Sequence, residues 1–224
     1  MTEHPVILAV GAVDERGVAG TDGVSASWSE LEADPPGSGR TYRRLFGKQD
    51  ETFRRLDRQT RAIVLAAEAC GVDRILSGPQ REEAGLFAET SHGSIEADLK
   101  FVRSLEKGLV EAAVFPYVLQ STCVGDVALR HGLHGPMVCL SVDDDCRGEA
   151  LREAAGVLAG GDVPFVVLAA VDMLKDPLPT LDVAMRSVVA VAAAPGFEGD
   201  PVAPWPADAA DPFRILADQC FARS

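Results

Sequence analysis

Three aspartates and a cysteine, Asp143-Asp144-Asp145-Cys146, stand between an apolar run and a segment with helical periodicity. Side chains at such a strand-to-helix junction lie near the first amides of the helix, which stabilise negative charge. A thiol there can lose its proton and act as a nucleophile, and a carboxylate can act as a base toward water. Aspartate is also a preferred N-cap, so the triplet equally suits a purely structural role. Cys146 fits the nucleophile role only if the junction holds two extra residues.

The other residues able to bind a metal are too scattered to predict a site. The five cysteines include Cys139 and Cys146, which lie seven apart rather than in a metal-binding pair. His131 and His134 flank a predicted helix end, where a cation is favourable, and no carboxylate or thiol partner is evident for them. We therefore expect no metal and no cofactor.

Composition limits the possible locations and partners. The chain has 224 residues, of which 47% are hydrophobic, and this is enough for a sizeable core. No apolar run reaches membrane-spanning length and the N-terminus lacks the order of a signal peptide, so we expect a cytoplasmic protein with reduced thiols. The net charge of −13 argues against nucleic acid and anionic membranes as partners. It also suits a basic protein partner better than an acidic carrier protein.

The positions of apolar residues predict alternating strands and helices. Strands are expected at 5–13, 72–76, 84–90, 137–142, 163–171 and 186–194, and helices at 56–71, 94–108, 119–131, 146–159 and 211–222. Residues 16–40 are predicted to be a loop and 77–83 a turn. This order predicts an α/β fold with a mostly parallel sheet covered by helices on both faces. We divide the chain into a domain over 1–194 and a Pro-rich tail with a short helix over 195–224.

Four segments, in order, resemble the N-terminal half of the β-ketoacyl synthases of the thiolase superfamily. They are PVILAVGAV, FRRLDRQTRAIVLAAEAC, AGLFAETSHGSIEADLKF and FPYVLQSTCVGDVALRHGLHGP, and the resemblance extends from residue 5 to about 172. In size the chain is similar to the short ketosynthase-like proteins of aryl polyene and type II polyketide systems, including chain-length-factor-like partners. The resemblance implies half of a thiolase-like fold.

The family resemblance also identifies the position of the nucleophile. The family's cysteine lies nine residues after the Gly of a Gly-Pro pair, here Gly135, and eighteen before an Asp that corresponds to Asp162. Both counts reach Asp144. A carboxylate is a poor acyl acceptor, because the resulting anhydride hydrolyses. The family's two catalytic histidines come from its C-terminal half, and this sequence has no histidine after Asp172. We therefore expect no catalytic residues and no condensing activity.

The resemblance implies a non-catalytic accessory protein in polyketide or fatty-acid type biosynthesis, similar to a chain length factor. Its expected partner is a ketosynthase subunit or a second copy of itself, with an acyl carrier protein as a further candidate. In ketosynthases the strand before the nucleophile lies at the two-fold interface, and half a fold should leave an apolar face uncovered. Pocket or interface roles are expected for Ser121, Cys123, Met137, Cys139, Ser141 and Asp144.

Two alternatives remain open. The first is a residual acyl-thioester hydrolase or decarboxylase with Asp144 as its base, which requires a partner group and a raised pKa. The second is a binding module for an acyl chain or a carrier protein.

Overall fold

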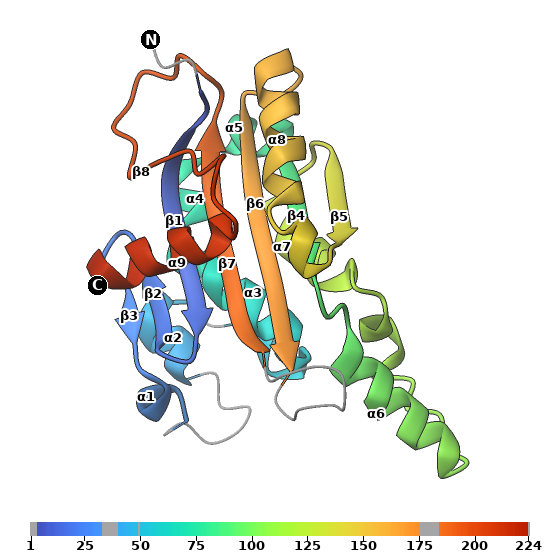
Figure 1. Cartoon of the computed structure of the whole chain (residues 1–224). Coiled ribbons are helices and arrows are strands. Elements are labelled where there is room, and N and C mark those ends of the chain that lie inside the picture. The colour runs from blue at the N-terminus through green and yellow to red at the C-terminus, as the bar shows by residue number, and fades with distance from the viewer. Residues whose placement is uncertain (1–3, 33–39, 49, 175–183, 224) are drawn as a thin grey trace.

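A computed structural model describes residues 4–32, 40–48, 50–174 and 184–223 (Figure 1). Its strands are β1 (Val6–Asp14), β2 (Gly17–Gly20), β3 (Ser25–Ala26), β4 (Gly85–Thr90), β5 (Met137–Ser141), β6 (Phe165–Leu174), β7 (Ala184–Ala193) and β8 (Ala203–Pro204). Its α-helices are α1 (Trp28–Glu32), α2 (Arg40–Phe46), α3 (Arg58–Cys70), α4 (Val72–Ile75), α5 (Gly78–Glu83), α6 (Ile95–Glu106), α7 (Thr122–His131), α8 (Glu149–Gly160) and α9 (Pro212–Arg223). Short 3-10 turns are η1 (Phe53–Arg55), η2 (Phe115–Val118) and η3 (Asp144–Cys146).

The strands form one sheet in the order β3-β2-β1-β7-β6-β4-β5, and β8 pairs with β1. β4 pairs in parallel with both β5 and β6, whereas the other pairs, from β3 across to β6, are antiparallel. The predicted α/β fold with a helix-covered sheet is confirmed, but parallel pairing is confined to one end. Only nine residues separate β6 from β7, and a parallel return needs a longer crossover, so these two strands run antiparallel.

Helices cover both faces of the sheet and create two apolar cores. β6 shows the alternation: Val167 and Ala169 face the core under α3, whereas Val166 and Leu168 face the core under α8 and α9. Figure 1 shows α8 and α9 lying across the near face and α3 behind the sheet. The continuous apolar run of β6 follows from this burial on both faces.

Helix α3 lies unusually close to the sheet because glycines face it. A Cβ added to Gly11 of β1 would lie 2.1 Å from the Ala66 carbonyl oxygen, and one added to Gly20 would lie 2.2 Å from that of Ala69. The helix predicted over 56–71 has Asp57 as its N-cap, and the Asp57 carboxylate accepts a hydrogen bond from the Thr60 amide at 3.0 Å. It ends at Gly71 in the left-handed conformation (φ 74°).

Four predictions about local structure are wrong. The predicted strand 72–76 is the short helix α4, for which Gly71 is the N-cap. The predicted turn 77–83 is the helix α5, which begins with a capping box between Ser77 and Gln80. The predicted loop 16–40 contains β2, β3 and α1, and its residues 33–39 lie outside the described part of the chain. The helix predicted from 146 begins at Glu149, since Gly148 adopts φ 84° and interrupts the backbone before it.

The Pro-rich tail packs on the sheet. β8 pairs with β1 beside Val6, and α9 buries Phe213, Leu216 and Cys220 in the core that it shares with α8. An ion pair of 2.9 Å between Arg16 and Asp218 joins α9 to the β1–β2 hairpin. Within the ranges described, no helix has the length and apolar character to cross a lipid bilayer.

Candidate functional site

The junction after β5 is a capped turn. The Asp143 carboxylate accepts a hydrogen bond from the Cys146 amide at 3.0 Å, so Asp143 is the N-cap of η3. Asp144 begins η3, and its side chain lies outside the described part of the chain. Asp144, which matches the position of the family's nucleophile, therefore does not directly precede α8. The rest of η3, Arg147 and Gly148 lie between them. This geometry supports the capping interpretation of the triplet.

A buried glutamate from β4 occupies the start of α8. Glu89 is 1% exposed, and its carboxylate accepts hydrogen bonds from the amides of Gly148 at 2.9 Å and Ala150 at 3.1 Å. Burial raises the pKa of Glu89, although the two amides oppose that shift. These amides are the groups that would otherwise stabilise an anionic nucleophile at the helix start. In this chain they are already bound to a carboxylate.

Cys146 is in an unfavourable place for a nucleophile. Its side chain is exposed, and the hydrogen bond and charge of Asp143 raise the pKa of the thiol above its ordinary value. Nucleophilic cysteines need the opposite shift, since the thiolate is the attacking species. The geometry gives the Cys146 alternative no support.

Gln120, between η2 and α7, brings three of the predicted pocket or interface residues together. Its carbonyl oxygen lies 3.2 Å from the Cys123 Sγ and 3.9 Å from the Cys139 Sγ. Its side-chain oxygen accepts a hydrogen bond from the Ser141 hydroxyl at 2.8 Å. Burial raises the pKa of both thiols, so they pack as neutral side chains.

The remaining predicted residues of this group lie on the surface nearby. Ser121 is exposed at the N-cap position of α7, where its hydroxyl makes no capping hydrogen bond. Met137 is 52% exposed at the start of β5, the last strand of the sheet. These two side chains therefore do not join the cluster around Gln120, but they flank it on the same edge of the sheet.

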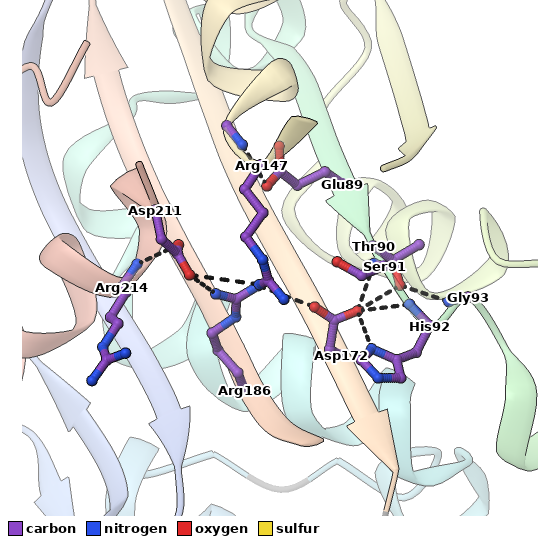
Figure 2. A network of polar contacts seen from close by, with 11 residues as sticks. Glu89, Thr90, Ser91, His92, Gly93, Arg147, Asp172, Arg186, Asp211 and Arg214 are labelled. Carbon is purple, nitrogen blue, oxygen red and sulfur yellow. Dashed lines mark hydrogen bonds and ion pairs between the residues drawn. The ribbon is translucent and has the colours of Figure 1, made fainter. Parts of the chain in front are cut away.

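A second polar centre lies where β4 and β6 end (Figure 2). Asp172 of β6 is buried, and its Oδ1 accepts hydrogen bonds from the Thr90 hydroxyl at 3.0 Å and from the amides of Ser91 at 2.7 Å and His92 at 3.0 Å. Its Oδ2 accepts one from the Arg186 guanidinium at 3.0 Å. The His92 Nδ1 lies 3.3 Å from Oδ1.

This centre continues to the tail helix. Arg186 of β7 also contacts Asp211 at 2.6 Å, and Arg147 approaches the same Asp211 oxygen to 3.5 Å. Asp211 in turn accepts a hydrogen bond from the Arg214 amide at the start of α9, at 3.0 Å. Together with Arg16 these groups line a cavity of about 750 Å³ between the sheet and α9.

The polar centre is suited to holding α9 in place and poorly suited to acid–base chemistry. Burial opposes ionisation of Asp172, but the His92 contact, the Arg186 charge and the two amides outweigh it and lower the pKa of the carboxyl. A general base needs a pKa near the working pH and a free lone pair directed at substrate. The oxygens of Asp172 and Asp211 are instead engaged by arginines and amides.

The histidines before the Gly-Pro turn differ in their surroundings. His131 is buried, and its Nδ1 lies 2.9 Å from Asp73 of α4, a carboxylate partner that the sequence did not reveal. The contact with His131 lowers the pKa of Asp73. His134 is exposed. Among the residues that the structure describes, no group of three or more His, Cys, Asp or Glu side chains could hold a metal ion.

Sequence reasoning missed the polar residues that organise both centres. Glu89 and Asp172 each carried a signal, since a single acid inside an otherwise apolar strand must find a partner when the strand is buried. Gln120 carried none, because its role depends on how η2 and α7 approach β5.

Known proteins resemble this chain in fold but not in sequence. No family model matches the chain and no curated protein matches its sequence. It is similar to the ishigamide ketosynthase/chain length factor, with a TM-score of 0.65 and 18% identity over 89% of this chain and 64% of that chain. It is similar to a chain in the complex of a ketosynthase (ApeO) with its chain length factor (ApeC) from Xenorhabdus doucetiae, with a TM-score of 0.60 and 16% identity over 99% and 92% of the two chains.

A β-ketoacyl synthase from Burkholderia phymatum gives a TM-score of 0.56 and 18% identity over 87% of this chain and 59% of that chain. The fold is that of the ketosynthases and chain length factors. The expected likeness to a short, ketosynthase-like protein of the thiolase type is thereby confirmed at the level of fold. The chain spans less than two thirds of the ishigamide and Burkholderia chains, and nearly the whole of the matched Xenorhabdus chain.

Proposed function

We propose that this chain is a non-catalytic, chain-length-factor-like subunit that pairs with a ketosynthase in polyketide-type biosynthesis. The observation that carries the proposal is the blocked start of α8. Glu89 binds the first amides of this helix, and the position of the family's nucleophile is occupied by Asp144. An acyl group has no activated thiol to accept it at this junction.

The similar solved structures support the pairing. Two of them are described as a ketosynthase/chain length factor and as a ketosynthase in complex with its chain length factor. The second of these matches nearly the full length of this chain. A subunit of this size and fold therefore has a structural counterpart among assemblies of two different chains.

The open edge of β5 supports a location for the contact. β5 is the last strand in the order of the sheet. On its β4 side, the Pro136 carbonyl oxygen accepts a hydrogen bond from the Leu86 amide at 2.8 Å, and the Val142 amide donates one to the Thr90 carbonyl oxygen at 3.0 Å. Because backbone groups alternate sides along a strand, the amides of Met137, Cys139 and Ser141 point to the open side. An unpaired edge with an exposed Met137 is suited to pairing with a strand of another subunit. We propose that this edge, with the exposed Ser121 beside it, forms the subunit interface, and that the buried Cys123 supports it from within.

Co-expression with a cognate ketosynthase tests the pairing. We expect a 1:1 heterodimer in size-exclusion chromatography with light scattering, stable on dilution. Two monomeric peaks over the whole concentration range would contradict the proposed function.

A surface variant tests the location. Met137→Lys places a charge on the β5 edge, and we expect it to weaken the heterodimer. The matched control is Ile215→Lys, which changes a 41% exposed residue on α9, on the opposite side of the sheet from α3. If both variants pair as well as the wild type, the interface lies elsewhere.

A further inference from the structure

Helix α6 and η2 form a projecting arm, and several of its large apolar side chains are exposed. In Figure 1 α6 extends away from the sheet beyond β4 and β5. Of its twelve residues, only Ala97 and Ser104 are buried. Ile95, Leu99, Val102 and Leu105 recur at helical spacing and give α6 an apolar face. Val102 and Leu105 on this face are 49% and 48% exposed.

The exposed apolar residues continue through the turn after α6. Leu109 is 63% exposed, Val110 70% and Phe115 59%, and Leu119 follows η2 at 63%. These side chains lie on two elements that pack together, α6 with the turn after it and η2. Exposed apolar surface gathered in one region is typical of interaction sites. We call Val102, Leu105, Leu109, Val110, Phe115 and Leu119 the arm patch.

The arm is held in a defined shape without any partner. The buried Ser104 accepts a hydrogen bond from the Leu109 amide at its carbonyl oxygen, at 2.9 Å, which closes the turn. The Phe101 and Phe115 rings pack with centroids 5.7 Å apart and join α6 to η2. At the base of the arm, the Ser94 hydroxyl donates to the Val118 carbonyl oxygen at 2.7 Å. A preformed surface loses less conformational entropy on binding than a segment that must first fold.

The base of the arm is continuous with the β5 edge. Leu119 directly precedes Gln120, whose side chain binds Ser141 at the end of β5. A partner paired with β5 is thus brought next to the arm patch. The outer surfaces of α8 and α9, which cover the face of the sheet opposite to α3, carry exposed charged side chains, among them Arg152, Glu153 and Arg214. Six of the exposed large apolar side chains thus gather on α6, η2 and the segments that follow them, whereas α9 exposes Ile215 alone among its large apolar residues.

We propose that the arm patch docks into an apolar groove of the ketosynthase subunit that pairs with β5, as a second contact separate from strand pairing. This inference rests on the proposed function, because it assigns the occupant of the patch from the same heterodimer. The arm gives the subunit an apolar anchor beyond the sheet edge, and edge pairing sets the register.

The test is the affinity of arm variants for the cognate ketosynthase. Leu105→Ser/Leu109→Ser removes two leucines that are 48% and 63% exposed, and the control Ile215→Ser removes a 41% exposed isoleucine from α9. Titration calorimetry should give at least a tenfold weaker Kd for the double variant and a change below twofold for the control. The melting temperatures of both variants should remain near that of the wild type, because the three side chains are exposed.

Each outcome separates the two proposals. Failure of the wild-type chain to bind the ketosynthase contradicts the proposed function. A wild-type complex whose Kd is unaltered in the double variant contradicts the arm proposal alone. The double variant could instead keep its affinity for the ketosynthase and lose self-association or carrier-protein binding. That result would assign the arm patch to a different occupant and overturn the inference. Hydrogen exchange over residues 102–115 gives a second readout, with slower exchange expected in the heterodimer than in the free chain.

Discussion

Replacing Glu89 tests the central feature of the site. Glu89→Ala leaves the amides of Gly148 and Ala150 without an acceptor in a buried environment. A hydrogen bond to a charged group contributes about 1.5–3 kcal/mol, so losing both should lower the free energy of unfolding by about 3–5 kcal/mol. Glu89→Gln keeps one acceptor oxygen and removes the buried charge, and we expect it to cost about 1–2 kcal/mol by the same reasoning. Urea denaturation followed by circular dichroism measures both values.

The pH dependence of the free energy of unfolding provides an independent test of the role of Glu89. Burial raises the folded-state pKa of Glu89 above its ordinary value. Its contribution to stability is therefore complete below that ordinary value, near about 4.3, and is lost as the pH rises through the raised one. We expect the wild type to gain stability relative to Glu89→Gln as the pH falls from 7 toward about 4.5.

The control for Glu89 is Glu153→Gln, an exposed position on α8, the helix whose first amides Glu89 binds. Its expected change is within about 0.5 kcal/mol. If Glu89→Ala costs no more than this control, or if the difference between Glu89→Gln and wild type does not depend on pH, the account of α8 capping is refuted.

Three further predictions concern other parts of the molecule. Because the pKa of Cys146 is raised, its alkylation by iodoacetamide, followed by mass spectrometry, should be slower at pH 7.5 than that of a free cysteine, and a rate that levels off below pH 8 would disprove this. Contact with His131 lowers the pKa of Asp73, so Asp73→Asn should be less stable than wild type at pH 7, and the gap should narrow below about pH 4; a gap unchanged down to pH 2.5 would argue against it. Gly11→Ala should cost about 2–3 kcal/mol because a Cβ there meets the α3 backbone, whereas Gly156→Ala, with open space around it, should stabilise by about 0.5–1 kcal/mol; equal melting temperatures would contradict the close approach.

The sequence predicts most of the elements because their signals are local. Helix α3 has an Asp57 cap and a Gly71 terminator, and β6 is a continuous apolar run, so both are recognised without tertiary information. The short helices α4 and α5 were missed, since a strand-like run such as 72–76 cannot be told from a helical turn by its apolar residues alone. The antiparallel pairing of β7 depends on the length of one connection rather than on strand composition.

The candidate site is less predictable than the fold. The position of Asp144 follows from counting along the chain, but the actual occupant of the helix start is Glu89, about sixty residues earlier. Likewise, Arg186 joins Asp172 to Asp211 from a third element, β7. Contacts between residues so distant in sequence depend on the topology of the sheet.

The place of β1 in the sheet has a consequence for synthesis on the ribosome. β1 pairs with β7 from Val6↔Ala193 to Asp14↔Arg186, so β1 leaves the ribosome about 170 residues before the strand it pairs with. Until then it carries one edge without its neighbour, and contacts of such high sequence separation slow folding. A nascent chain stalled before residue 184 should therefore be a good client for chaperones that hold exposed strands, and release of the full chain should end that association.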